Sequence, residues 1–167
     1  KATQTGCIAQ FAASGKKTKK KNLALIAMAY GDVYVAQVAF GANPMKAIQA
    51  FKEAESYNGP SLIIAYAPCI NQGIKGGLVN SIQEEKKAVD CGFFTTWRYD
   101  PRLVKQGKPG LQLDCAEPDF TKFRDFLLTE NRFAMLPKVN PSEYEELFKK
   151  AEEAAKERWN SVKKFGL

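Results

Sequence analysis

The sequence predicts an α/β fold in which a parallel sheet carries helices on both faces. Three segments rich in β-branched and aromatic residues, at 33–40, 61–67 and 93–99, alternate with segments of helical periodicity. The connections between them are short, and this order favours right-handed crossovers between parallel strands. The segment 61–67 is apolar almost throughout, which is typical of a strand that is buried on both faces.

Helical segments separate these three predicted strands. An apolar run at 23–30 ends at a glycine, and Asn43 followed by proline predicts the start of a helix that reaches residue 57. A further helix is predicted at 78–90. The apolar face predicted for the helix after Asn43 consists of Ile48, Phe51 and Ala54, at three-residue steps.

The second half of the chain is predicted to be loop-rich between 101 and 139. Within it we expect a short strand at 111–113, a helix at 121–128 and irregular structure at 131–139. The remainder, 140–167, predicts one long amphipathic helix. Its start is indicated by Asn140, Pro141 and Glu143, which have the spacing of a capping box. The chain thus divides into a basic irregular segment 1–21, a βαβ core 22–100, the loop-rich part and this helix. Trp97 and Trp159 are expected to be core anchors.

The composition excludes several classes of active site. The 167 residues include no histidine, so this chain alone cannot form a Ser-His-Asp or Cys-His nucleophile system. A histidine-based zinc site or a 2-His-1-carboxylate iron site is excluded for the same reason. No uncharged run approaches the roughly 18 residues that a membrane-spanning helix needs, and we see no signal-peptide pattern.

Positive charge is concentrated near the amino terminus. The net charge is +7, and residues 1–21 hold six lysines and no acid. A cluster that starts at Lys16 and ends at Lys21 could bind an anionic partner or nucleic acid, which would make the protein a small basic α/β binding module. The other interpretation is a solvated loop. The absence of interleaved aromatic or arginine residues favours the loop.

The four cysteines are Cys7, Cys69, Cys91 and Cys115, and their spacing matches neither a zinc site nor a ferredoxin motif. A free cysteine is most often a small apolar side chain that is buried in the core. Cys69 differs because it follows the apolar strand 61–67, and open α/β sheets bind ligands at the carboxyl ends of their strands. It could be a nucleophile, a metal ligand or a structural residue, and its spacing alone favours the structural role.

Five segments of the sequence, taken in order, resemble the C-terminal part of the pyruvate:ferredoxin (flavodoxin) oxidoreductases. The resemblance covers nearly the whole chain, and its longest run is the most specific. The segments are 1–6, 31–36, 51–73, 98–103 and 130–133.

This resemblance implies a large multidomain oxidoreductase of anaerobic metabolism. Enzymes of the family decarboxylate pyruvate on thiamine diphosphate with Mg²⁺, form acetyl-CoA from CoA, and pass electrons through [4Fe-4S] clusters to ferredoxin or flavodoxin. The resemblance further implies a homodimer without a membrane or nucleic-acid partner. Its expected location is the cytoplasm, or the hydrogenosome in an anaerobic protist.

The resemblance also assigns a role to Cys69. In the family, the cysteine of the motif matched by residues 67–71 is one of four thiolates that hold the cluster closest to the thiamine. The other three, and the motif that binds Mg²⁺ and the diphosphate, lie upstream in the family. We therefore expect residues 1–167 to be the C-terminal portion of a thiamine-diphosphate-binding domain, inactive alone. No catalytic or thiamine-binding residue is assigned within the chain. Cys7, Cys91 and Cys115 match no family ligand and are interpreted as structural.

Overall fold

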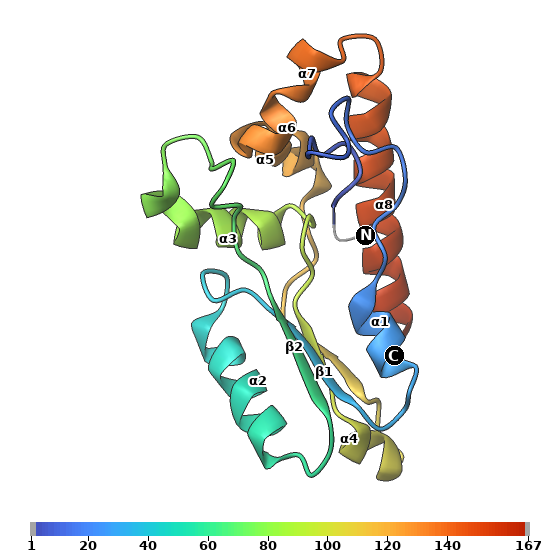
Figure 1. Ribbon diagram of the computed structural model, residues 1–167. Coiled ribbons are helices and arrows are strands. Elements are labelled where there is room, and N and C mark those ends of the chain that lie inside the picture. Colours follow the sequence, from blue (N-terminus) through green and yellow to red (C-terminus); the bar gives the residue numbers. More distant parts are fainter. Residues whose placement is uncertain (1–2, 166–167) are drawn as a thin grey trace.

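A four-stranded mixed sheet lies at the centre of the lower half of the molecule (Figure 1). The computed structural model describes residues 3–165; Lys1, Ala2, Gly166 and Leu167, which belong to the first and last predicted segments, lie outside them. The strand order is β2-β1-β3-β4, and helices surround the sheet, so the predicted α/β class is confirmed. The strands are β1 (Tyr34–Val38), β2 (Ser61–Ala65), β3 (Trp97–Tyr99) and β4 (Leu111–Leu113).

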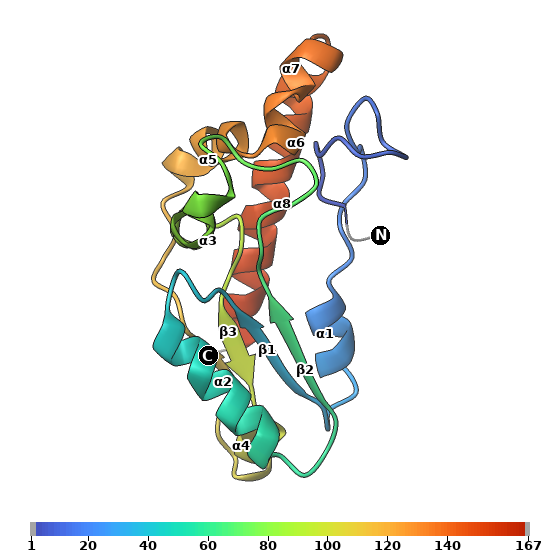
Figure 2. The same cartoon turned by 60° about the vertical axis from the view of Figure 1, so that its left-hand side comes forward.

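The sheet is only partly parallel. β1 and β2 pair in parallel, whereas β3 is antiparallel to both β1 and β4. The prediction that segment 93–99 forms a third parallel strand is therefore wrong. Its preceding helix packs above the sheet instead of returning along a face (Figure 2). The chain consequently re-enters the sheet from the carboxyl ends of β1 and β2, and β3 runs the opposite way. Phe93 and Phe94 pack in the core before the strand begins.

β2 is an edge strand in this structure. Its terminal residues Ser61 and Ala65 are exposed, and the three between them are only partly buried. The expected burial on both faces is therefore not found. Among the described residues, no further strand pairs with the outer edge of β2. An edge strand with this sequence is unusual, since edges normally carry charged residues or proline.

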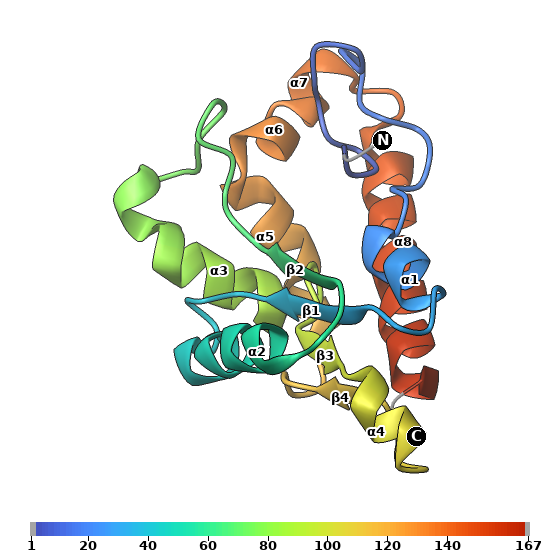
Figure 3. The same cartoon turned by 60° about the horizontal axis from the view of Figure 1, so that its bottom comes forward.

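Helices cover both faces of the sheet (Figure 3). α2 (Pro44–Ser56) lies on one face and begins where predicted, with the Asn43 side chain accepting a hydrogen bond from Lys46 N at 3.0 Å. Its buried residues are Ala47 and Ala50, and Ala54 packs partly buried against the same cluster, so the predicted apolar face is wrong for Ile48 and Phe51. Small side chains let the helix approach the sheet closely. Ile48 and Phe51 point outward instead, 42% and 57% exposed.

The opposite face is covered by α1 (Leu23–Met28) and the carboxyl half of α8 (Tyr144–Phe165). α8 begins four residues later than predicted. The carboxamide of Asn140 donates instead to Glu143 at 2.8 Å and to the carbonyl of Ser14 at 3.0 Å, which anchors the turn before the helix. Trp97 and Trp159 are both buried, as predicted.

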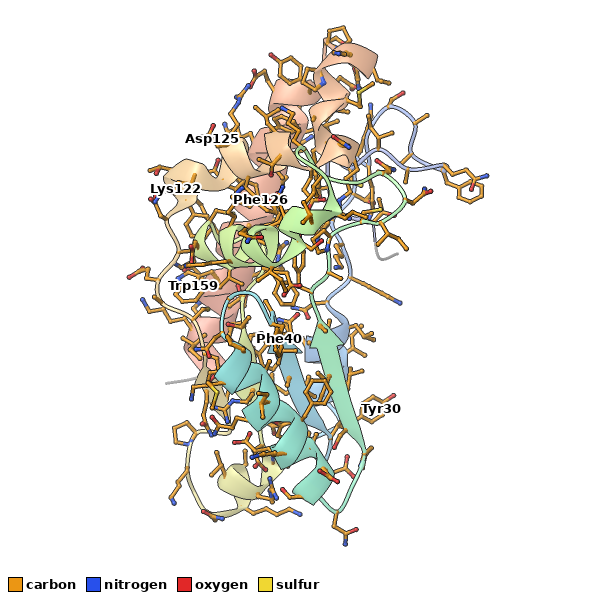
Figure 4. All side chains as sticks on the ribbon, turned by 90° about the vertical axis from the view of Figure 1, so that its left-hand side faces the viewer. Tyr30, Phe40, Lys122, Asp125, Phe126 and Trp159 are labelled. Carbon is orange, nitrogen blue, oxygen red and sulfur yellow. The ribbon has the colours of Figure 1, made fainter. Side chains whose placement is uncertain are left out.

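A second, aromatic core lies above the sheet, between short helices and the amino-terminal half of α8. Phe93, Phe123, Phe126 and Phe133 pack together there, and Figure 4 marks Phe126 among the helices of this region. Residues 131–139, predicted to be irregular, form two short helices. The remaining elements are η1 (Leu78–Asn80), α3 (Ser81–Asp90), α4 (Pro101–Lys105), η2 (Phe120–Lys122), α5 (Phe123–Thr129), α6 (Asn131–Ala134) and α7 (Leu136–Val139).

The amino-terminal segment lies beside α8 and α7 (Figure 1). Residues 3–21 contain no helix or strand apart from an isolated bridge between Ala9 and Ala12. Two of the clustered lysines contact acids of the α8 region: Lys17 pairs with Glu143 at 2.6 Å, and Lys19 pairs with Glu157. These contacts neutralise part of the positive charge of the segment.

A buried ion network joins β3 and β4 to α2. Arg98 donates to both carboxylate oxygens of Asp114, at 2.7 and 2.9 Å, and to Glu53. Tyr34 also donates to Glu53, at 2.9 Å. Burial opposes ionisation of Glu53, but the donors Arg98, Tyr34 and Gln49 together lower the pKa of its carboxyl group. The network therefore pairs the buried guanidinium of Arg98 with the carboxylates of Asp114 and Glu53.

Candidate functional site

Cys69 lies in the loop that leaves the carboxyl end of β2, as the sequence predicts. Its side chain is partly buried. The N–H of Gly73 donates to the Cys69 carbonyl at 2.8 Å, which closes a tight turn around the cysteine. Gly73 has a φ of +72°, a conformation that other residues rarely adopt. The turn therefore fixes the backbone on which the thiol is carried.

A second segment, 129–131, holds this loop from one side. The side-chain amide of Asn131 donates to the Gln72 carbonyl at 2.7 Å, and its backbone N–H donates to the Gly73 carbonyl at 3.2 Å. The N–H of Lys75 donates to the Thr129 carbonyl at 2.8 Å. These bonds satisfy polar backbone groups of the loop that would otherwise need water.

The amino-terminal segment holds the same loop from another side. The side chain of Gln72 donates to the Ile8 carbonyl at 3.0 Å. The N–H of Ile8 in turn donates to the Arg132 carbonyl at 2.9 Å. Three segments that are far apart in the sequence therefore meet at the Cys69 loop, and each is linked to another by backbone hydrogen bonds.

Buried ionisable groups lie beneath this junction. Glu130, whose exposed fraction is 0%, accepts a hydrogen bond from the Tyr66 hydroxyl at 3.0 Å and lies 3.1 Å from Nε of Arg132. Burial raises the pKa of Glu130 even though Arg132 and Tyr66 favour its charged form. The pKa of Tyr66 is raised by burial and by the neighbouring Glu130.

Of the other cysteines, Cys7 and Cys91 are buried, whereas Cys115 is partly buried like Cys69. Cys7 is buried but close enough to Cys69 for an electrostatic interaction; burial raises the pKa of its thiol, and Arg132 opposes that change. Cys91 is buried in the aromatic core, where desolvation raises its pKa to about 12. Burial also raises the pKa of Cys115. A thiol that resists ionisation is a poor nucleophile. The structural roles expected for these three residues stay predictions.

The chain by itself supplies few metal donors. Residues 3–165 contain no group of three or more His, Cys, Asp or Glu side chains placed to hold a metal ion. A [4Fe-4S] cluster needs four thiolates, so Cys69 could provide only one of them. In the same part of the chain, no helix is both long and apolar enough to cross a membrane.

The sequence singled out Cys69 as a candidate but not the residues that hold its loop. Glu130, Asn131 and Arg132 belong to a segment that the resemblance had picked out without a role. The structure places that segment against the Cys69 loop. Its polar residues just after the predicted helix 121–128 were the only available signal, and nothing in the sequence indicated what they contact.

Comparison with known proteins gives close matches along the whole chain, although no family model matches it. The pyruvate:ferredoxin oxidoreductase of Moorella thermoacetica is 53% identical over 164 residues, 98% of this chain. The pyruvate-flavodoxin oxidoreductase of Klebsiella pneumoniae is 49% identical over 159 residues, 95% of this chain. The NADP(+) pyruvate dehydrogenase of Euglena gracilis, named as mitochondrial, is 45% identical over 141 residues.

The chain is therefore similar, over nearly its whole length, to a segment of known pyruvate oxidoreductases. In particular, it matches a segment of the pyruvate:ferredoxin and pyruvate-flavodoxin oxidoreductases, which confirms the resemblance seen in the sequence. It spans 14% of the length of the Moorella and Klebsiella relatives and 8% of the Euglena relative.

Proposed function

We propose that the chain is one segment of an enzyme that oxidatively decarboxylates pyruvate to acetyl-CoA and passes the electrons to ferredoxin or flavodoxin. In this proposal Cys69 is a ligand of a [4Fe-4S] cluster, and thiamine diphosphate, Mg²⁺ and CoA bind mainly to other parts of the parent polypeptide. The full enzyme is proposed to be a homodimer. The observation that carries the proposal is the partly exposed Cys69 thiol on an anchored loop at the carboxyl end of β2.

The thiol of Cys69 and the rigid loop that carries it are both suited to binding one iron of a cluster. When bound, the cluster would carry electrons between thiamine diphosphate and the external acceptor. The contribution of this chain is to hold one thiol in a fixed place. The Gly73 turn, Asn131 and Gln72 restrict the loop on three sides, and partners of this kind orient metal ligands and tune their properties.

The outer edge of β2 supports the view that the chain belongs to a larger domain. In a parallel ladder, alternate residues bond to a given neighbour. Because Tyr66 N donates to Val38 of β1, the backbone groups of Ser61, Ile63 and Ala65 face away from β1. Side chains on both faces of β2 are apolar. We propose that another strand of the parent polypeptide pairs with this edge, within a thiamine-diphosphate-binding domain.

The ligand assignment can be tested in the full-length protein with Cys69→Ser. We expect about one cluster per chain to be lost or altered in iron content and in its EPR signal, with slower reoxidation of the thiamine intermediate by the electron acceptor. Cys91→Ala is the matched control, because that thiol is buried away from the loop. Unchanged iron content and EPR signal in Cys69→Ser would show the assignment to be wrong.

The segment proposal has its own test. The isolated 167-residue chain should not decarboxylate pyruvate when supplied with thiamine diphosphate, Mg²⁺, CoA and an electron acceptor. Turnover close to that of the intact enzyme would contradict the proposal.

A further inference from the structure

A cavity of about 240 Å³ lies between the amino-terminal segment, the sheet and α8. Its walls include Lys20 from the segment, Arg158 from α8 and Phe94 from the connection into β3. The same elements lie side by side in Figures 1 and 2. The cavity is separate from the Cys69 loop, whose residues do not line it.

The cavity is lined by cations, and Glu157, the acid next to Arg158 in the sequence, does not line it. Lys20, Lys21 and Arg158 line it, and none of its lining residues is acidic. Among residues 3–165, no carboxylate lies within 4 Å of Lys20 or Arg158, whereas the nearby Lys19 pairs with Glu157. The Arg158 guanidinium has only a long hydrogen bond, 3.4 Å, to the Phe93 carbonyl.

Among these cations Arg158 is partly buried, whereas Lys20 and Lys21 are exposed at the rim of the cavity. Desolvation lowers the pKa of Arg158, and Glu157 partly opposes that change. Desolvation and the positive charge of Arg158 both lower the pKa of Lys20. Partly buried charges are normally paired, because water no longer stabilises them fully. A partly buried arginine with two lysines on the same cavity therefore points to an anion that residues 3–165 do not supply.

The position of the cavity also favours a ligand. Gln37 and Ile64, the last residues but one of β1 and β2, line its floor, and parallel strands of α/β sheets present ligand sites at these ends. The side walls are apolar, formed by Phe93, Phe94 and Val162. A cationic end and an apolar wall suit a molecule that has an anionic group and a small carbon skeleton.

We propose that this cavity binds the phosphate group of a small phosphorylated molecule, with Lys20 and Arg158 as the binding cations. A phosphate monoester carries about 1.5 to 2 negative charges at pH 7 and so balances two cations, whereas one carboxylate balances one. Arginine offers a planar pair of donors that matches phosphate oxygens. The phosphate could belong to free inorganic phosphate or to a nucleotide.

The proposal is tested by equilibrium dialysis of the full-length protein against inorganic phosphate and, separately, against ADP. We expect saturable binding that Lys20→Gln and Arg158→Gln each weaken about tenfold or more, since a charge-assisted hydrogen bond is lost. Arg158→Lys should retain part of the affinity. Lys19→Gln is the matched control, because its ion pair lies outside the cavity, and it should bind normally.

The two probes distinguish the sources of the phosphate. Tighter binding of ADP than of inorganic phosphate would assign the apolar wall to a nucleotide, and binding of inorganic phosphate alone would assign the cavity to the free ion. Absence of binding to the full-length protein, as expected if a carboxylate of the parent polypeptide fills the cavity, would overturn the proposal. Equal binding by wild type and both variants would overturn it too. Iron content is measured in parallel. Because it reports on the Cys69 assignment, a failure of that assignment can be told apart from a failure of phosphate binding.

Discussion

The side-chain amide of Asn131 donates a 2.7 Å hydrogen bond to the carbonyl of Gln72, three residues beyond Cys69. Asn131 is the first residue of α6, and Gln72 lies in the loop after β2. The bond therefore connects the helical region above the sheet directly to the loop that carries the candidate ligand. On the other side of the loop, the side chain of Gln72 donates to the Ile8 carbonyl, so the loop is held from both sides.

Replacing Asn131 should loosen the Cys69 loop. In Asn131→Ala the Gln72 carbonyl loses its donor, which costs about 1–3 kcal/mol if the group stays buried. Hydrogen exchange of the full-length protein should then show faster exchange for amides of residues 70–75. Asn80→Ala is a matched control, since it removes a 2.9 Å amide-to-carbonyl bond at the exposed end of the same loop. Equal exchange in both variants would contradict the prediction.

Glu130 should make stability depend on pH. Burial raises its pKa above the ordinary value of 4.5, so the folded state favours the protonated form. This contribution to stability is fully present below pH 4.5 and is lost as pH rises through the raised pKa. Glu130→Gln cannot ionise, and its stability should fall less than that of wild type between pH 4.5 and 8. Parallel denaturation curves for the two proteins across that range would rule this out.

Arg98 should be among the most sensitive positions for stability. Arg98→Met leaves the carboxylate of Asp114 buried, with Lys46 at 3.6 Å as its remaining ion-pair partner. We expect a loss of about 3–5 kcal/mol in urea unfolding. The control is Arg124→Met, which breaks a surface pair with Glu145 in which both side chains are about half exposed. That change should cost no more than about 1 kcal/mol, so similar losses for the two variants would refute the prediction.

Gly41 should not tolerate a side chain. A Cβ atom added there would lie 2.1 Å from the carbonyl oxygen of Ile82 in α3, and backbone cannot give way as a flexible side chain can. The N–H of Gly41 also donates to Glu85 at 2.8 Å. Gly41→Ala should therefore destabilise the protein by about 1–3 kcal/mol. A thermal melt would reveal this, with exposed Gly107→Asn, a left-handed position that asparagine tolerates, as the control.

Several features could be predicted from the sequence because they depend on neighbouring residues. Asn43 and Pro44 start α2 as predicted, and the strand composition around Tyr34 and Ile63 identified β1 and β2. The direction of β3 could not be predicted, since it depends on where α3 packs. The face of α2 was misread because Ile48 and Phe51 have helical spacing, although only the alanines fit against the sheet.

The candidate site, too, could be predicted only in part from the sequence. Cys69 could be located because it follows an apolar strand directly, so its place in the fold is set by a few residues of sequence. Asn131 and Ile8 support it from about 60 residues away on either side. Contacts over such separations depend on the whole fold, and no local pattern of residues encodes them.

The outer edge of β2 also bears on how the separate chain would behave in solution. The outward-facing backbone groups of Ile63 and Ala65 are an open template for another strand, and Leu62 to Ala65 carry no charge that would repel one. Copies of the chain made without the rest of the parent polypeptide should therefore self-associate into β-rich aggregates. The substitution Ala65→Lys, at an exposed position of β2, should oppose this, because a charge on an edge strand disfavours edge-to-edge pairing.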